Sequence, residues 1–137
     1  MNNVKFLTLI FILITVGIIG GYSVLNSVFP KSPPIRLPES EEVIAVHISE
    51  NQQNSVELET TKIEPLLTEI GKAVPIRTMS VNDYPTVKPY YLISIQCCNN
   101  TYYYFIYTEN NQTYIEMPYE GIYKADSRIY SIISIKP

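Results

Sequence analysis

The sequence is poor in the residues that most metal, nucleotide and hydrolytic sites require. One histidine, two cysteines and five glycines occur among 137 residues, and tryptophan is absent. No second cysteine pair or nearby histidine completes a zinc-ligand set, and no glycine-rich loop could cradle a phosphate. Asp83, Glu116, Glu120 and Asp126 have a spacing that matches no known calcium loop. We therefore expect no metal and no cofactor.

Positive charge is also scarce. Ten Lys and Arg against 13 Asp and Glu give a net charge of −3. Nucleic-acid binding requires a concentrated basic face, and attraction to anionic lipid requires a polybasic patch. The sequence has neither, so we expect no nucleic-acid partner.

Charge is nearly absent from the first 30 residues, where Lys5 is the only charged side chain. Residues 6–25, FLTLIFILITVGIIGGYSVL, are uncharged and about as long as an apolar helix that crosses a bilayer. Lys5 predicts that the N-terminus is cytoplasmic and the rest of the chain is outside. We expect residues 1–29 to be an uncleaved anchor in the cytoplasmic membrane, held there through residues 6–25. The alternative is a cleaved signal peptide and a secreted domain.

Four of the ten prolines fall in residues 30–40, PKSPPIRLPES. Proline fixes φ and biases the preceding residue away from helix, which predicts an extended, semi-rigid spacer. The expected organisation is an anchor over residues 1–29, a spacer over 30–40 and an extracytoplasmic domain over 41–137.

The domain is expected to begin with two antiparallel strands, at residues 43–49 and 55–59. A five-residue loop, 50–54, would place Ile48 opposite Val56 and His47 opposite Glu57. That register gathers the apolar side chains on one face, and the burial of such a face specifies register. Residues 76–81, between prolines, are expected to form a short edge strand.

A helix is predicted after these strands, with Thr61 as N-cap and Glu64 completing a capping box. Its apolar stripe consists of Ile63, Leu66, Leu67 and Ile70. Gly71 is the predicted stop. Near the C-terminus, residues 126–133 fit either a short helix or an edge strand, because their isoleucines are β-branched.

Two Asn-Asn pairs predict hairpin turns, because asparagine tolerates a positive φ. A turn at Asn99-Asn100 would pair Cys97 with Tyr102. A turn at 110–111 would pair Ile106 with Ile115. Both registers place the same apolar residues on one face, which predicts a three-stranded antiparallel meander.

The adjacent cysteines of SIQCCNN, Cys97 and Cys98, resemble a reactive pair. Neighbours in a strand point to opposite faces, so the two thiols are not expected to share a metal. We expect Cys97 to be a packed core residue and Cys98 to be a free thiol near the hairpin tip.

The tyrosines are the candidate binding residues. The second face of the meander carries Tyr103, Phe105, Tyr107 and Tyr114, and it is either packed under another layer or exposed. If exposed, it would be a recognition surface, since tyrosine is rigid and amphipathic. The segment PYEGIY adds further aromatics, and the hypothetical binding set is Tyr103, Phe105, Tyr107, Tyr114, Tyr119 and Tyr123.

Two motifs resemble those of a known family. They are Ser80-Val81-Asn82-Asp83 with Pro85, and Tyr114-Ile115-Glu116-x-Pro118-Tyr119-x-Gly121-Ile122-Tyr123. Over about residues 40–135 the chain resembles small exported domains of unknown function from Gram-positive bacteria, carried on lipoproteins or single-helix anchors. The resemblance implies an α+β fold and an extracytoplasmic location, and it carries over no catalytic residues. The chain has no cysteine before Cys97 to take a lipid, which favours the helical anchor.

The expected fold is α+β, with an antiparallel sheet of about five or six strands, one amphipathic helix and the anchor before them. The expected function is a non-enzymatic interaction module at the cell envelope, whose partner is a protein, a peptide or a wall component. One alternative is an envelope enzyme that uses His47 and a carboxylate such as Glu57 as acid and base. Another is a self-protection protein that intercepts a bacteriocin. No catalytic residue is assigned.

Overall fold

A computed structural model describes residues 2–133, so residues 134–137 of the predicted domain lie outside the described part. The chain divides into two compact units, Met1–Lys31 and Ser32–Pro137. The first contains helix α1 (Asn2–Val28), whose 23-residue segment Phe6–Val28 reaches a mean hydropathy of 2.2. By length and composition this helix could cross a membrane, and a signal sequence has the same properties.

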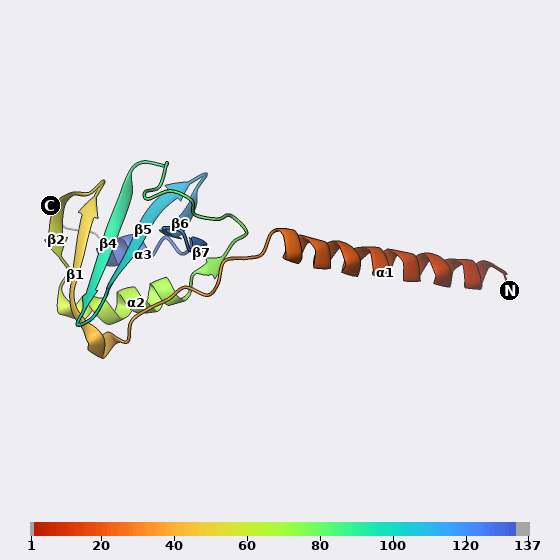
Figure 1. Ribbon diagram of the computed structural model, residues 1–137, viewed down its shortest axis with the longest axis horizontal. Coiled ribbons are helices and arrows are strands. Elements are labelled where there is room, and N and C mark those ends of the chain that lie inside the picture. The colour runs from red at the N-terminus through yellow and green to blue at the C-terminus, as the bar shows by residue number, and fades with distance from the viewer. Residues whose placement is uncertain (1, 134–137) are drawn as a thin grey trace. The chain divides into compact units, whose positions relative to one another are not determined.

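The second unit is built on one antiparallel sheet in the order β2-β1-β4-β5-β6-β7-β3 (Figure 1). Its strands are β1 (Val43–Glu50), β2 (Gln53–Glu57), β3 (Val74–Pro75), β4 (Tyr90–Cys97), β5 (Thr101–Glu109), β6 (Gln112–Met117) and β7 (Gly121–Ala125). The sheet therefore has seven strands, and the expectation of five or six is wrong. Residues 121–125 form the full strand β7, in which Tyr123 pairs with Ile115. The short edge strand lies at 74–75 instead of 76–81, because the chain leaves the sheet after Ile76 donates to the Ile122 carbonyl.

The β5–β6 hairpin has the predicted register, with Ile106 opposite Ile115. Asn110 and Asn111 have φ values of 49° and 60°. Two consecutive positive values are those of a type I′ turn, whose twist matches that of the strands it joins.

The β4–β5 hairpin differs from the prediction by two residues. Tyr102 pairs with Ile95, and the turn centres on Cys98-Asn99, closed by a 2.8 Å hydrogen bond from the Cys97 N–H to the Asn100 carbonyl. Both registers bury the same side chains, because a shift of two residues leaves every residue on its original face. The predicted faces are therefore correct although the pairing is not.

The β1–β2 hairpin keeps the predicted pairs of His47 with Glu57 and Ile48 with Val56. Its turn is tighter than the expected five-residue loop. Glu50 pairs with Gln53, and Asn51 and Gln52 both have positive φ. An irregularity between Ile48 and Glu50 adjusts the register.

Helices α2 (Ile63–Gly71) and α3 (Ile129–Ile133) pack on one face of the sheet. All four residues of the predicted α2 stripe are buried. The predicted capping box is not formed, because the 3₁₀ turn η2 (Thr60–Lys62) leads into the helix and makes Lys62 the N-cap. The helical option for the C-terminal segment is the one observed.

Residues 32–38, named here the strap, are part of the folded domain and not a free spacer. Ser32 and Pro38 are buried, and Ile35 and Leu37 pack against the main core. The Ser32 N–H donates to the Ile76 carbonyl at 3.2 Å, and the Tyr104 hydroxyl donates to the Arg36 carbonyl at 2.5 Å. An extended segment has no internal hydrogen bonds, so its backbone groups are free to bond to the domain. The 3₁₀ turn η1 (Ser40–Glu42) then leads into β1.

Candidate functional site

The second face of the sheet is partly covered by the loop over residues 76–89. Phe105 and Tyr107 are only 3% and 5% exposed and cluster with Tyr90. Tyr84 of the loop packs its ring edge-on against Phe105, with centroids 6.0 Å apart. Of the two possibilities for this face, burial under another layer therefore applies to Phe105 and Tyr107.

Two hydrogen bonds between the family-like motifs hold this loop in place. The Ser80 hydroxyl donates to Glu116 Oε1 at 2.6 Å, and the Tyr119 hydroxyl donates to Asp83 Oδ1 at 2.5 Å. Glu116 is itself buried, and a buried carboxylate requires such donors. The pKa of Tyr107 is raised, first by burial and then by the nearby Glu116 carboxylate. The polar residues of both motifs thus have a structural role.

The other candidate tyrosines are placed differently. Tyr123 is fully buried in the main core, and Tyr114 is half-buried, stacked on Tyr107 at 5.7 Å. Tyr119 is 64% exposed, and its hydrogen bond to Asp83 raises its pKa. Tyr103 is 51% exposed at the open end of the second face. The six tyrosine and phenylalanine side chains therefore do not form one continuous surface.

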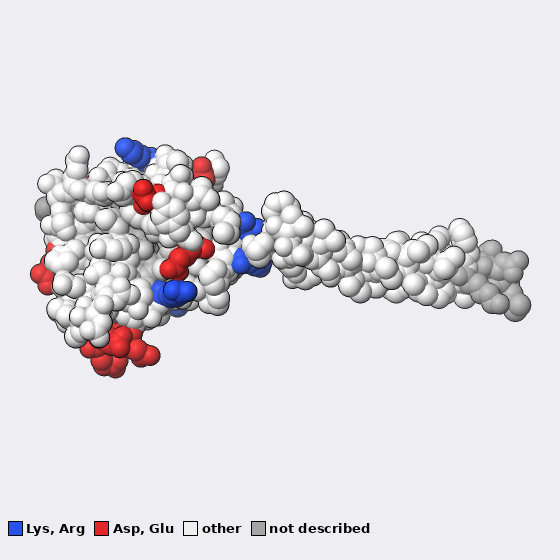
Figure 2. Space-filling model, viewed as in Figure 1, with Lys and Arg blue, Asp and Glu red and all other residues white. Residues whose placement is uncertain are grey.

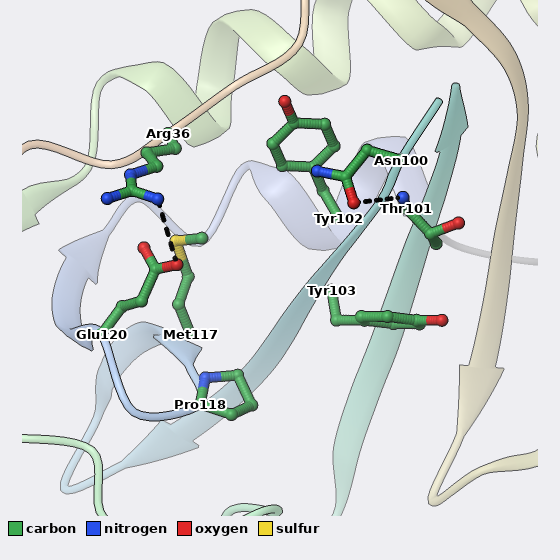
Figure 3. A pocket seen from close by; sticks show the side chains of 8 residues that line it. All are labelled: Arg36, Asn100, Thr101, Tyr102, Tyr103, Met117, Pro118 and Glu120. Carbon is green, nitrogen blue, oxygen red and sulfur yellow. Dashed lines mark hydrogen bonds and ion pairs between the residues drawn. The ribbon is translucent and has the colours of Figure 1, made fainter. Parts of the chain in front are cut away.

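Tyr103 lines a cavity of about 280 Å³ between the β4–β5 hairpin, the strap and the β6–β7 turn (Figure 3). Its wall contains four consecutive residues of the hairpin, Asn100, Thr101, Tyr102 and Tyr103. The remaining wall consists of Met117, Pro118, Glu120 and Arg36. In Figure 3, Arg36 and Glu120 lie on one side of the hollow with Met117, and Tyr102 and Asn100 lie on the other. We name this hollow the Tyr103 cavity.

The charged groups of the Tyr103 cavity are one cation and one anion. Arg36 Nη1 lies 3.8 Å from Glu120 Oε1, with the Arg36 side chain 70% exposed and that of Glu120 34% exposed. Glu120 Oε2 is buried without a hydrogen-bond partner among the described residues. The Glu120 carboxylate also contributes, after burial, to raising the pKa of Tyr123.

A second cavity, of about 370 Å³, adjoins the first and shares Asn100 and Tyr102 with it. Cys97 and Cys98 both line it, and both thiols are free. Cys98 is exposed, whereas Cys97 is half-buried and packs against the main core but is not enclosed in it, which the prediction of a core residue required. Burial first, and then Glu42, raises the pKa of Cys97, which disfavours its thiolate.

Acidic side chains gather at one end of the domain, over η1 (Figure 2). This segment carries the exposed residues Glu39, Glu41 and Glu42. The Lys and Arg side chains on the same face are scattered and form no large patch (Figure 2).

His47 lies in a row of polar residues across the sheet. Its register partners are Glu57 on β2 and Ser94 on β4, and Tyr103 follows Ser94 on β5. Within residues 2–133, no hydrogen bond or ion pair links His47 to another side chain. Adjacent strands thus align an acid, an imidazole and a hydroxyl, but the three groups are not hydrogen-bonded to one another.

Sequence reasoning missed several residues of the Tyr103 cavity. The sequence pattern places Arg36 in the spacer and Tyr102 on the core face, against which Tyr102 does pack. The apolar residues Ile35 and Leu37 in the proline-rich segment were the available signal that it packs on the domain. The segment PYEGIY did indicate the region that supplies Pro118 and Glu120.

The chain is similar to one solved structure, an NMR structure of a protein from Ruminococcus gnavus. The two are 30% identical, with a TM-score of 0.61, and the match covers 74% of this chain and 99% of that one. A comparison with curated proteins gave no match. The family model of DUF5301, described as a domain of unknown function, matches residues 31–124, from the beginning of the strap to β7. Because that match covers most of the chain and the solved relative shares the fold, the protein belongs to the DUF5301 family.

Proposed function

We propose that the protein is a single-pass membrane protein whose second unit is a non-enzymatic binding domain outside the cytoplasmic membrane. The apolar segment Phe6–Val28 of α1 and the single charge before it, Lys5, support the anchor and its orientation. The partner is a component of the cell envelope, and the Tyr103 cavity is its binding site.

The observation that carries this proposal is the half-exposed Tyr103 side chain in the wall of a cavity. Loop 76–89 covers Phe105 and Tyr107 on the same face, whereas Tyr103 stays open to solvent. The fold does not use the Tyr103 hydroxyl, which has no hydrogen bond among the described residues. A large, rigid aromatic side chain beside free polar groups is typical of a binding site.

The orientation can be tested with the native thiol of Cys98. Because Cys98 is exposed, a membrane-impermeant maleimide should label the full chain in intact protoplasts that express it. Cys98→Ser should remove most of the label, since Cys97 is half-buried and its thiolate is disfavoured. Labelling of the wild type only after lysis would contradict the proposed orientation. The mass of the mature chain distinguishes an anchor from a cleaved signal.

The binding function can be tested by co-sedimentation with isolated cell walls of the producing organism. We expect the full chain, in lipid nanodiscs, to sediment with the walls and Tyr103→Ser to remain in the supernatant. The matched control is Tyr84→Ser, which replaces a tyrosine that is 52% exposed outside the cavity. If wild type and Tyr103→Ser sediment equally, the cavity is not the binding site.

A second candidate is an envelope enzyme, favoured by the row of Glu57, His47 and Ser94. The row matches the order of acid, base and nucleophile in hydrolases, although its groups are not hydrogen-bonded. A cellular phenotype that His47→Ala abolishes, and that Tyr103→Ser leaves intact, would favour the enzyme over the binding domain.

A further inference from the structure

We propose that the Tyr103 cavity binds a saccharide unit of a neutral glycan. This inference rests on the proposed binding function and names the chemical class of its ligand. Charge, hydrogen-bonding groups, shape and strand topology each support it.

The charge of the cavity wall suits an uncharged ligand. Arg36 and Glu120 face each other across 3.8 Å, so the wall carries one positive and one negative charge. A strongly cationic or anionic ligand would gain from one of these groups and be repelled by the other. A neutral ligand can accept hydrogen bonds from the guanidinium and donate to the carboxylate without separating a pair of charges.

The wall also offers hydrogen-bonding groups that the fold leaves free. Within residues 2–133, the hydroxyls of Tyr102, Tyr103 and Thr101 have no hydrogen-bond partner. The Asn100 side chain uses its oxygen to accept from the Thr101 N–H at 2.8 Å, which leaves its amide N–H groups free. In Figure 3 the Tyr103 and Thr101 hydroxyls point away from Arg36 and Glu120, toward the outer end of the cavity. A hydrocarbon ligand offers no partner to such groups, whereas a polyhydroxylated ligand that extends past Tyr103 supplies donors and acceptors.

The shape of the cavity fits one sugar ring with its neighbours in solvent. Its volume of about 280 Å³ lies near the lower end of the range for small-molecule pockets. Tyr103 and Pro118 supply apolar surface in the lower part of the view, and Met117 supplies it beside Glu120 (Figure 3). A sugar ring has the same two-sided character, with C–H groups on its faces and hydroxyls around its edge.

Strand topology argues against an extended peptide in the same place. Peptides often bind by adding a strand to a free sheet edge. The cavity lies beside β5 and β6, and both have neighbouring strands on each side in the order β4-β5-β6-β7. No backbone edge is therefore open at this site.

The test is binding of neutral trisaccharides to the full chain. Lipid nanodiscs are required, because many detergents carry sugar headgroups that would compete. Chitotriose, cellotriose, maltotriose and mannotriose are titrated at millimolar concentration, with a lysine-rich peptide as the alternative probe, and binding is measured by saturation-transfer NMR. We expect at least one trisaccharide to bind. Tyr103→Ser should weaken it about tenfold, since one aromatic contact contributes about 1.4 kcal/mol. The control Tyr84→Ser should stay within about twofold.

The outcomes separate the ligand class from the binding function. One outcome is that no trisaccharide binds in a way that depends on Tyr103, whereas co-sedimentation with walls does depend on Tyr103. In that case the saccharide proposal is wrong and the binding function stands. Binding of the lysine-rich peptide through Tyr103 would then identify a polypeptide ligand. If neither trisaccharides nor walls bind through Tyr103, both proposals are wrong.

Discussion

Glu116 is a buried carboxylate whose position explains why two distant sequence motifs occur together. It accepts the Ser80 hydroxyl at 2.6 Å, and three residues further along, Tyr119 donates to Asp83. Each residue could be mistaken for a catalytic acid or a ligand-binding group when its motif is considered alone. Their contacts show that they attach loop 76–89 to the sheet, which in turn buries the aromatic residues beneath it.

The first prediction contrasts two aromatic residues on alternate positions of β5. Phe105→Ser should lower the free energy of unfolding by about 3–5 kcal/mol, because it removes a ring from a packed cluster. Tyr103→Ser should change it by about 0.5 kcal/mol or less, since the side chain is half exposed. Urea unfolding of the full chain in nanodiscs, followed by near-UV circular dichroism of the tyrosines, measures both. Equal losses would show that Tyr103 belongs to the packed face.

At the scale of elements, the strap is the first segment of the chain that packs on the domain. Its contacts extend over residues 32–38 and reach the main core, the Tyr104 hydroxyl and the carbonyl of Ile76. The approach is closest at Gly121, where a Cβ would lie 2.1 Å from Ser32 Oγ and 2.3 Å from Ser32 Cβ. Glycine is required at position 121 because a side chain has no space there. Backbone conformation is not the reason, because the φ of Gly121 is not positive.

The second prediction follows from this contact. Gly121→Ala should destabilise the domain by about 3 kcal/mol, because the added methyl group forces the strap or β7 to move. Ser32→Gly in the same chain removes both clashing atoms and should restore more than half of the loss. Urea midpoints of the two single variants and the double variant form a double-mutant cycle. Additive effects would show that the strap and Gly121 are not in contact in solution.

At the scale of the whole molecule, most of the aromatic side chains in the buried clusters are tyrosines. The chain has 12 tyrosines, four phenylalanines and no tryptophan. Tyr104 and Tyr107 are buried in the two separate clusters on opposite faces of the sheet. Burial raises the pKa of both, with smaller contributions from Tyr102 at Tyr104 and from Glu116 at Tyr107.

The third prediction concerns alkaline pH. Because the folded-state pKa values of Tyr104 and Tyr107 are raised above the unfolded value of about 10, the unfolded chain loses these protons first. The stabilising contribution is therefore complete below pH 10 and declines as the pH rises further. Absorbance of tyrosinate should show Tyr104 and Tyr107 ionising well above pH 10, together with loss of near-UV circular dichroism. A single titration of all tyrosines near pH 10 in the folded protein would contradict this.

The features that depend on local pattern follow from the amino-acid sequence alone. The uncharged run at residues 6–25 predicts the long apolar helix, and alternation with a period of two assigns the faces of β4, β5 and β6. That period also explains why the faces were correct when the β4–β5 register was wrong by two. The pair Asn110-Asn111 specified a turn, because the positive φ of both residues is a local preference of asparagine and does not require contacts with distant segments.

The covering of the aromatic residues and the composition of the cavity depend on how distant segments of the chain pack together. Phe105 and Tyr103 are two residues apart on β5 and therefore point to the same face. Their exposed fractions differ because loop 76–89 covers Phe105 and does not cover Tyr103. Arg36 joins Tyr103 and Glu120 because the strap folds back over the domain, through contacts such as that of Tyr104 with the Arg36 carbonyl, 68 residues apart. Such contacts depend on the total apolar surface that segments far apart in the chain bury against one another. A local sequence pattern does not contain this information.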